Sequence, residues 1–255
     1  MSEVHLLIDG RIAEMRLDNP AKLNALTPEM LDQIAAHCDR LEREAQVVAV
    51  LVTATGPKAF CTGADINAWA GLAPADFARH WVRAGHRVFD RLARLSKPTI
   101  AVLDGAAYGG GLELAASCDI RVMSPRSKIA LPETAVGIVP GWSGSQRLAR
   151  LLPVAVLKEM ALFGRVLTAE RAHALGFAAE VSDDPGAAAL DIAERLLVTS
   201  PRATEVAKYM IHAAMGEDRD AMIEALGAGM TAATADKAEG VAAFRAKRKP
   251  EFPGT

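Results

Sequence analysis

Short apolar runs alternate with helix-forming stretches through the first half of the chain, and this alternation limits the possible folds more than any other feature. Residues 47–53 and 99–103 are nearly continuous apolar runs of strand length. Such runs are typical of parallel strands that are buried on both faces. A helical pattern occupies residues 28–42, with Thr27 in the capping position before a proline. Strands that alternate with helices in this way predict an α/β core.

The chain begins with β structure. Two extended runs, residues 4–8 and 11–17, flank the dipeptide Asp9-Gly10. Asp-Gly between two such runs predicts a β-hairpin with a type I′ turn.

Further strands are expected around residues 119–123 and 128–131, and helical patterns dominate after residue 144. The sequence therefore predicts an α/β core over residues 1–199 and a helical C-terminal region over residues 200–255. The boundary between them is expected near Ser200-Pro201.

Composition argues against several other classes of protein. The formal net charge of the 255 residues is −2, which lacks the basic excess of a nucleic-acid-binding surface. The longest aliphatic run, residues 47–52, is far shorter than the roughly 18 residues of a membrane span. The N-terminus resembles neither a secretory signal nor a transit peptide. The three cysteines and six histidines lack metal-binding spacing, so the cysteines are expected to be reduced, buried thiols. We expect a cytoplasmic protein with no membrane segment, nucleic-acid partner or metal.

Two glycine-containing segments follow the two buried strands. They are residues 60–66 (FCTGADI) and residues 109–111 (GGG). Small residues let the backbone approach a ligand, and peptide N–H groups at the start of a helix favour negative charge. Two converging donors of this kind form an oxyanion hole. The alternative is that the glycines only permit close helix packing.

Other glycine motifs are poorly matched. Residues 105–113 do not spell G-x-G-x-x-G, and no Gly-Lys-Ser/Thr follows them. Residues 141–145 (GWSGS) miss the G-x-S-x-G nucleophile elbow by their last residue. A serine hydrolase is therefore a weak alternative.

Two glutamates lie close to these turns. Glu113 follows Gly110 in the first turn of the expected helix, and Glu133 follows Pro132 after the last expected strand. Glu113 can simply complement the helix dipole, and Glu133 can be a solvated loop residue. Their apolar neighbours favour a cleft of low dielectric constant, which raises a carboxyl pKa. For Glu113 the helix N-terminus opposes this rise, and the sequence leaves the balance open.

Taken together, several motifs in a fixed order resemble the crotonase, or enoyl-CoA hydratase/isomerase, family. They are NALT (24–27), FCTGADI (60–66), GAAYGGGLELA (105–115), CDIR (118–121), LPE (131–133), GIVPG (137–141), QRL (146–148) and FRAKRK (244–249). This resemblance covers essentially the whole chain. It implies a spiral of β-β-α turns with a helical C-terminal trimerisation region, a homo-oligomer (a trimer or a dimer of trimers), and an acyl-CoA thioester substrate. No cofactor is implied beyond the CoA moiety of that substrate.

The resemblance also implies roles for particular residues. The oxyanion hole falls on the N–H groups of Ala64 and Gly110. Glu113 would activate a water held near the Gly141 N–H, and Glu133 would protonate the α-carbon. Since hydratases of the family carry both glutamates, the implied activity is enoyl-CoA hydratase, which converts a trans-2-enoyl-CoA into a 3-hydroxyacyl-CoA. A Δ3,Δ2-enoyl-CoA isomerase, or another acyl-CoA dehydratase or hydrolase of the family, remains an open alternative.

The CoA ester has its own implied contacts. The matching positions are Lys22, Ala25, Ala64, Asp65, Ile66, Tyr108, Gly110, Pro132, Trp142, Phe244 and Lys247. The basic cluster at residues 245–249 can equally be a solvated terminus. Two positions depart from the family pattern. Trp142 replaces a residue that is usually small in hydratases, and Asn67 stands where a basic residue is common.

Overall fold

The N-terminal hairpin is present, but its turn is not the expected one. In the computed structural model, which describes residues 2–217 and 219–255, β1 (Glu3–Asp9) pairs antiparallel with β2 (Ile12–Asp18). Asp9 pairs with Ile12, so the loop is Gly10-Arg11, and of these two only Gly10 has a positive φ, of 56°. A positive φ at the first loop residue alone is typical of a type II′ turn. The type I′ prediction was wrong because Asp9 is the last residue of the strand.

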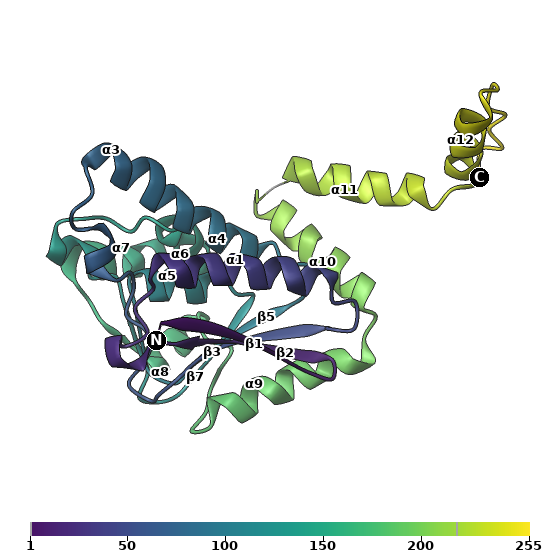
Figure 1. Cartoon of the computed structure of the whole chain (residues 1–255). Helices are drawn as coiled ribbons and strands as arrows, with labels where there is room; N and C mark the ends of the chain where they lie inside the picture. The colour runs from purple at the N-terminus through teal and green to yellow at the C-terminus, as the bar shows by residue number, and fades with distance from the viewer. Residues whose placement is uncertain (1, 218) are drawn as a thin grey trace. The chain divides into compact units, whose positions relative to one another are not determined.

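The larger sheet has six strands in the order β1-β2-β3-β5-β7-β10 (Figure 1). From β2 onward, neighbouring strands run parallel. The four remaining strands are β3 (Ala49–Ala54), β5 (Thr99–Leu103), β7 (Ile120–Met123) and β10 (Glu180–Val181). This arrangement confirms the strands predicted near residues 47, 99 and 119.

A second sheet of four short strands follows the order β4-β6-β8-β9. Its members are β4 (Ala59–Cys61), β6 (Ala106–Tyr108), β8 (Lys128–Ala130) and β9 (Leu167–Thr168). The sequence predicts β8 but gives no indication of β4 and β6. Along the chain, β3 and β4, then β5 and β6, are each followed by helical structure. The chain therefore makes repeated β-β-α turns.

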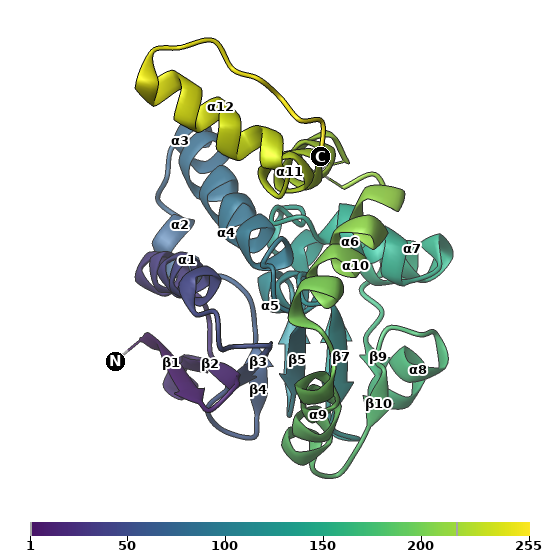
Figure 2. The same cartoon turned by 90° about the vertical axis from the view of Figure 1, so that its right-hand side faces the viewer.

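Helices cover both faces of the larger sheet (Figure 1). The helix α1 (Pro28–Arg43) is capped by the Thr27 side chain, as expected, and lies on one face. The helix α9 (Pro185–Glu194) packs small residues against the other face. The other helices up to residue 198 are η1 (Pro20–Lys22), α2 (Ile66–Trp69), α3 (Pro74–Asp76), the π-helix η2 (Phe77–Val82), α4 (Arg83–Ala93), α5 (Gly110–Ala116), η3 (Glu133–Val136), α6 (Gly144–Leu151), α7 (Val154–Phe163), α8 (Ala169–Ala174) and η4 (Arg195–Val198) (Figure 2).

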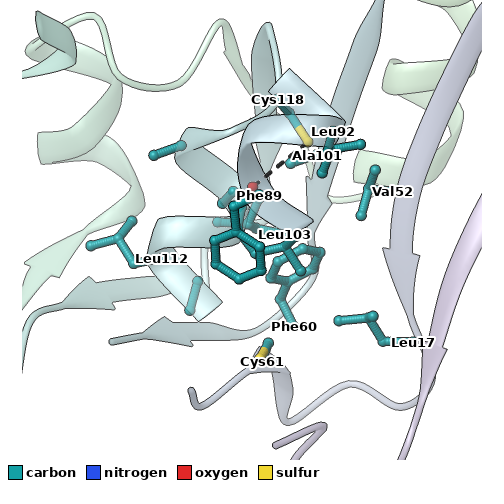
Figure 3. Close-up of a cluster of buried hydrophobic side chains, with 14 of the residues drawn as sticks. Leu17, Val52, Phe60, Cys61, Phe89, Leu92, Ala101, Leu103, Leu112 and Cys118 are labelled. Atoms are coloured by element: carbon teal, nitrogen blue, oxygen red, sulfur yellow. Dashed lines mark hydrogen bonds between the residues drawn. The ribbon is translucent and has the colours of Figure 1, made fainter. Parts of the chain in front are cut away.

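The main core lies between the two sheets and the helices α1, α4 and α5. Leu17 and Val52 from the larger sheet meet Phe60, Phe89 and Leu112 there, all of them buried (Figure 3). The three cysteines, Cys38, Cys61 and Cys118, are buried reduced thiols, as predicted. The core thus fixes β4 and α5, which carry the two glycine turns.

The chain divides into two compact units, one ending at Pro201 and the other spanning Arg202–Thr255. The second unit contains most of α10 (Pro201–Ala214), together with α11 (Arg219–Ala232) and α12 (Ala235–Ala246). A role for this unit in trimer formation stays a prediction. Across the described residues, no helix combines the length and the apolar character needed to cross a bilayer.

Candidate active site

The turn after β4 leaves one peptide N–H free. The N–H of Leu26 donates to Gly63 O at 2.8 Å, and the N–H of Asp65 donates to Leu26 O at 2.8 Å. These two bonds bracket Ala64, which forms an isolated parallel bridge with Leu26. Because backbone groups alternate in direction along an extended segment, the Ala64 N–H points away from Leu26. It is therefore available to a ligand.

The turn after β6 offers a second N–H. Gly109 has φ 52° and ψ −126°, and Gly110 is the first residue of α5. The N–H at this position has no acceptor within its own helix. A Cβ placed on Gly63 would lie only 3.4 Å from Gly110 N, so the two glycine turns are in contact. Within the described residues, neither this N–H nor that of Ala64 donates to a backbone carbonyl.

The carboxyl group of Glu113 is buried and held by the backbone of another segment. Glu113 is only 2% exposed to solvent. Its Oε1 accepts the N–H groups of Trp142 at 2.8 Å and Gly144 at 2.7 Å. Burial raises the pKa of Glu113, while the N–H groups of Trp142, Gly144 and Gly141 and the charge of Arg147 lower it. Desolvation therefore prevails, and the opposing donors come from the loop before α6 and the first residue of α6 rather than from α5.

Glu133 is the second buried acid. It is the first residue of η3, is 7% exposed, and its Oε2 has no hydrogen-bond partner among the described residues. Burial raises the pKa of Glu133 to about 7, and the charge of Glu113 adds to the rise. Its Oε1 lies 2.9 Å from the position that a Cβ on Gly109 would occupy. Glu133 is thus an acid with a proton available near neutral pH, seated beside the glycine turn.

Both carboxyls open into one cavity of about 220 Å³. Backbone of the two turns and apolar side chains complete its wall. The lining residues are Thr62, Gly63, Ala64, Ile66, Trp69, Phe77, Trp81, Val82, Gly109, Gly110, Glu113, Pro132, Glu133, Ala135, Val136, Ile138, Val139, Gly141 and Trp142. A largely apolar cavity with a few convergent polar groups is typical of a small-molecule site.

Most of the residues predicted for the site meet in this cavity. They are Ala64, Ile66, Gly110, Glu113, Pro132, Glu133, Gly141 and Trp142. Within the first unit, Lys22, Ala25, Asp65 and Tyr108 lie outside the cavity wall. Lys22 and Asp65 form an exposed ion pair at 2.6 Å, which lowers the pKa of Asp65. Phe244 and Lys247 belong to the second unit, and their part in the site stays a prediction.

Part of the cavity wall was not predicted. Trp69, Phe77, Trp81 and Val82 come from α2 and the π-helix η2. One signal was visible in the sequence, since two of the three tryptophans of the chain fall in this short stretch.

The serine of the near-match to the nucleophile elbow does not form a hydrolase site. Ser143 is buried outside the cavity wall, and its Oγ lies 3.2 Å from both ring nitrogens of His86. The His86 Nε2 also faces Asp90 at 3.5 Å. In a catalytic triad one ring nitrogen faces the serine and the other faces the acid. Because Ser143 Oγ is equally distant from both nitrogens, it lies along the N–H bond or lone pair of neither, so the triad geometry is absent.

Comparison with known proteins identifies the family of the chain. The family model described as enoyl-CoA hydratase/isomerase matches residues 8–255. The chain is 32% identical to a short-chain-enoyl-CoA hydratase of Clostridium acetobutylicum over 98% of its own length and 97% of the relative. It is 36% identical to the mitochondrial methylglutaconyl-CoA hydratase of Mus musculus over 91% of its length and 76% of the relative.

Solved structures share the fold over nearly the whole chain. An enoyl-CoA hydratase from Bacillus anthracis aligns with a TM-score of 0.81 at 30% identity, covering 99% of both chains. Pseudomonas aeruginosa DspI aligns with a TM-score of 0.82 at 31% identity, covering 98% of this chain and 96% of DspI. These matches confirm the expected crotonase-like α/β fold. The chain therefore belongs to the enoyl-CoA hydratase/isomerase, or crotonase, family.

Proposed function

We propose that this protein is an enoyl-CoA hydratase, which adds water across the double bond of a trans-2-enoyl-CoA to give a 3-hydroxyacyl-CoA. One observation carries the proposal: the carboxyls of Glu113 and Glu133 line a single cavity beside the two glycine turns. Addition of water needs one group that removes a proton from water and another that supplies a proton to carbon. Two carboxyls whose surroundings differ can divide these tasks.

In this reaction the thioester carbonyl lies against the N–H groups of Ala64 and Gly110. Glu113, as a carboxylate, accepts a proton from water while the water oxygen forms a bond to the β-carbon. The electrons of the double bond move toward the thioester oxygen, which becomes an enolate bound by the two N–H groups. Removal of one such donor typically costs about 10²–10³ in rate.

Glu133, as a carboxylic acid, then donates its proton to the α-carbon, and the carbonyl is restored. Glu113 leaves the cycle protonated and Glu133 ionised, so proton exchange with solvent resets the pair. The raised pKa of Glu133, about 7, supports this assignment because its acid form persists near neutral pH. The hydrogen bonds to Glu113 Oε1 stabilise the ionised form of that residue, against burial, which keeps its pKa above the ordinary value.

The remaining expectations belong to the same proposal. Lys22, Ala25, Asp65, Ile66 and Tyr108 are proposed to lie near the CoA moiety, as the family resemblance implies. Phe244 and Lys247 are proposed to reach the CoA bound to a neighbouring subunit of a trimer or a dimer of trimers.

Product analysis tests the reaction. Incubation with a trans-2-enoyl-CoA is expected to yield a product heavier by one water, with loss of the absorbance of the conjugated thioester. An isomerase acting on a 3-enoyl-CoA would give a product of unchanged mass, and a hydrolase would release free CoA thiol. Either of these outcomes without hydration would contradict the proposed function.

A further inference from the structure

The indole of Trp142 is seated between two glycines. A Cβ on Gly85, in α4, would lie 2.2 Å from its Cε2 and Nε1. A Cβ on Gly110 would lie 2.9 Å from its Cε3. Such distances are far below van der Waals contact, so each glycine leaves room that the indole fills. The indole therefore closes the space between α4 and the first turn of α5.

Two other aromatic rings hold the indole in this place. The ring centroids of Trp81 and Trp142 lie 5.2 Å apart, and those of Phe89 and Trp142 lie 5.3 Å apart with the rings at 78°. Aromatic pairs favour tilted and edge-to-face arrangements at these separations. Trp142 is 3% exposed, yet it forms part of the cavity wall. Its position is thus fixed by packing.

The wall beside the indole is apolar and built by an uncommon element. The π-helix η2 contributes Phe77, Trp81 and Val82 to the cavity. Short π-helical segments are rare and occur frequently at functional sites. Among the described residues that line the cavity there is no Lys, Arg or His. A carboxylate buried here would lose its hydration without gaining a cation.

We propose that Trp142, seated against Gly85, is the specificity-determining residue for the acyl group, and that the site selects CoA esters with a neutral, unbranched apolar chain. The indole blocks the space between α4 and α5, so the chain follows the wall formed by Phe77, Trp81 and Trp69. A branch close to the thioester meets the indole. This inference deepens the proposed function, since it rests on the same cavity binding a CoA ester.

Binding of saturated esters tests the acyl preference without requiring any reaction. Calorimetric titration with octanoyl-CoA, 3-methylbutanoyl-CoA and glutaryl-CoA compares a linear, a branched and an acidic acyl group. Octanoyl-CoA is expected to bind at least about a hundredfold more tightly than glutaryl-CoA, because the terminal carboxylate must be desolvated. Equal or tighter binding of glutaryl-CoA would overturn the neutral-chain assignment.

Variants of the glycine and the indole test the part played by Trp142. Trp142→Ala is expected to lower the octanoyl-to-3-methylbutanoyl affinity ratio by about tenfold, because the vacated space admits a branch. Gly85→Ala displaces the indole and is expected to weaken octanoyl-CoA binding by about tenfold. In the double variant Gly85→Ala/Trp142→Ala the added methyl no longer meets an indole, so the affinity ratio should equal that of Trp142→Ala. Gly227→Ala, on α11 with open space around it, is the matched helical control and should leave the ratio unchanged.

Three outcomes separate the claims. An unchanged ratio in Trp142→Ala would overturn the role of the indole, and this test holds even if Gly85→Ala does not fold. If the esters bind with the stated selectivity but trans-2-octenoyl-CoA is not hydrated, the proposed reaction fails and the acyl assignment stands. If trans-2-octenoyl-CoA is hydrated but the three saturated esters bind with equal affinity, the acyl assignment fails and the reaction stands.

Discussion

Oε1 of Glu113 accepts the N–H of Gly144 at 2.7 Å, although the two residues are 31 positions apart in the sequence. Ser143, between the two donors Trp142 and Gly144, has a φ of 78°, and α6 begins immediately after it. The left-handed conformation of Ser143 directs the N–H groups of the residues before and after it toward Glu113 Oε1, as in an anion-binding nest. The arrangement gives a buried carboxyl two hydrogen bonds from backbone N–H groups.

Replacement of Glu113 by Gln should separate its chemical role from its structural one. The amide oxygen of Gln can still accept the N–H groups of Trp142 and Gly144, so the fold is expected to persist. Loss of the base should lower kcat for hydration by about 10²–10⁴. Stopped-time product assays, with the melting temperature as a folding control, measure both effects. A folded Gln variant with undiminished kcat would show that Glu113 is not the base.

The rate of hydration should depend on the ionisation of Glu133. Because the reaction uses its acid form and its pKa is raised to about 7, kcat/KM should fall as pH rises through about 7. A pH profile of kcat/KM for the unmodified protein measures this. A rate that increases steadily from pH 6 to pH 9 would contradict the assignment of Glu133 as the proton donor.

The same group should make stability depend on pH. A carboxyl whose folded pKa is raised contributes stability that is fully present below its ordinary pKa and is lost as pH rises through the raised value. For Glu133 this window runs from 4.5 to about 7. The free energy of unfolding of Glu133→Gln, measured in denaturant titrations, should therefore rise relative to the unmodified protein across this window. A constant difference between the two proteins would contradict burial of the ionisable group.

Gly109 should be sensitive to the smallest side chain. Its φ of 52° with ψ of −126° disfavours residues with a Cβ, and an added methyl would lie 2.9 Å from Glu133 Oε1. Gly109→Ala is therefore expected to lower the free energy of unfolding by about 1–3 kcal/mol and to displace the acid. Gly164→Ala is the matched control, since Gly164 has a φ of 69° with open space around it and bears only the backbone strain. Denaturant melts and hydration rates compare the pair, and equal loss of activity in both variants would contradict contact with Glu133.

Much of the scaffold was predictable because it depends on local patterns. The apolar runs at β3 and β5 and the Thr27 cap of α1 follow from residue type and spacing alone. The strands β4 and β6 were missed because each has only three residues and borders a glycine turn, so neither shows a periodic pattern. The hairpin turn was misassigned by one residue, since register depends on which pairs close the hairpin rather than on the dipeptide.

The site was predictable in its residues but not in its contacts. The motif resemblance selected Glu113 and Glu133, and the structure places both in one cavity. No local pattern indicates that the N–H groups of Trp142 and Gly144 hold Glu113, because this contact depends on how α6 packs beside α5. No local pattern indicates the contact between Gly85 and the Trp142 indole either. The two residues are 57 positions apart in the sequence and meet only in the folded chain.

Hydration of trans-2-octenoyl-CoA by Glu133→Gln tests the central claim most directly. Gln fills the same space but carries no acidic proton, so the rate of hydration should fall by about 10²–10⁴. Binding of octanoyl-CoA should remain within about threefold of the unmodified protein, since the apolar wall is unchanged. Full hydration activity in a folded Glu133→Gln variant would contradict the roles of Glu133 as the proton donor and Glu113 as the base.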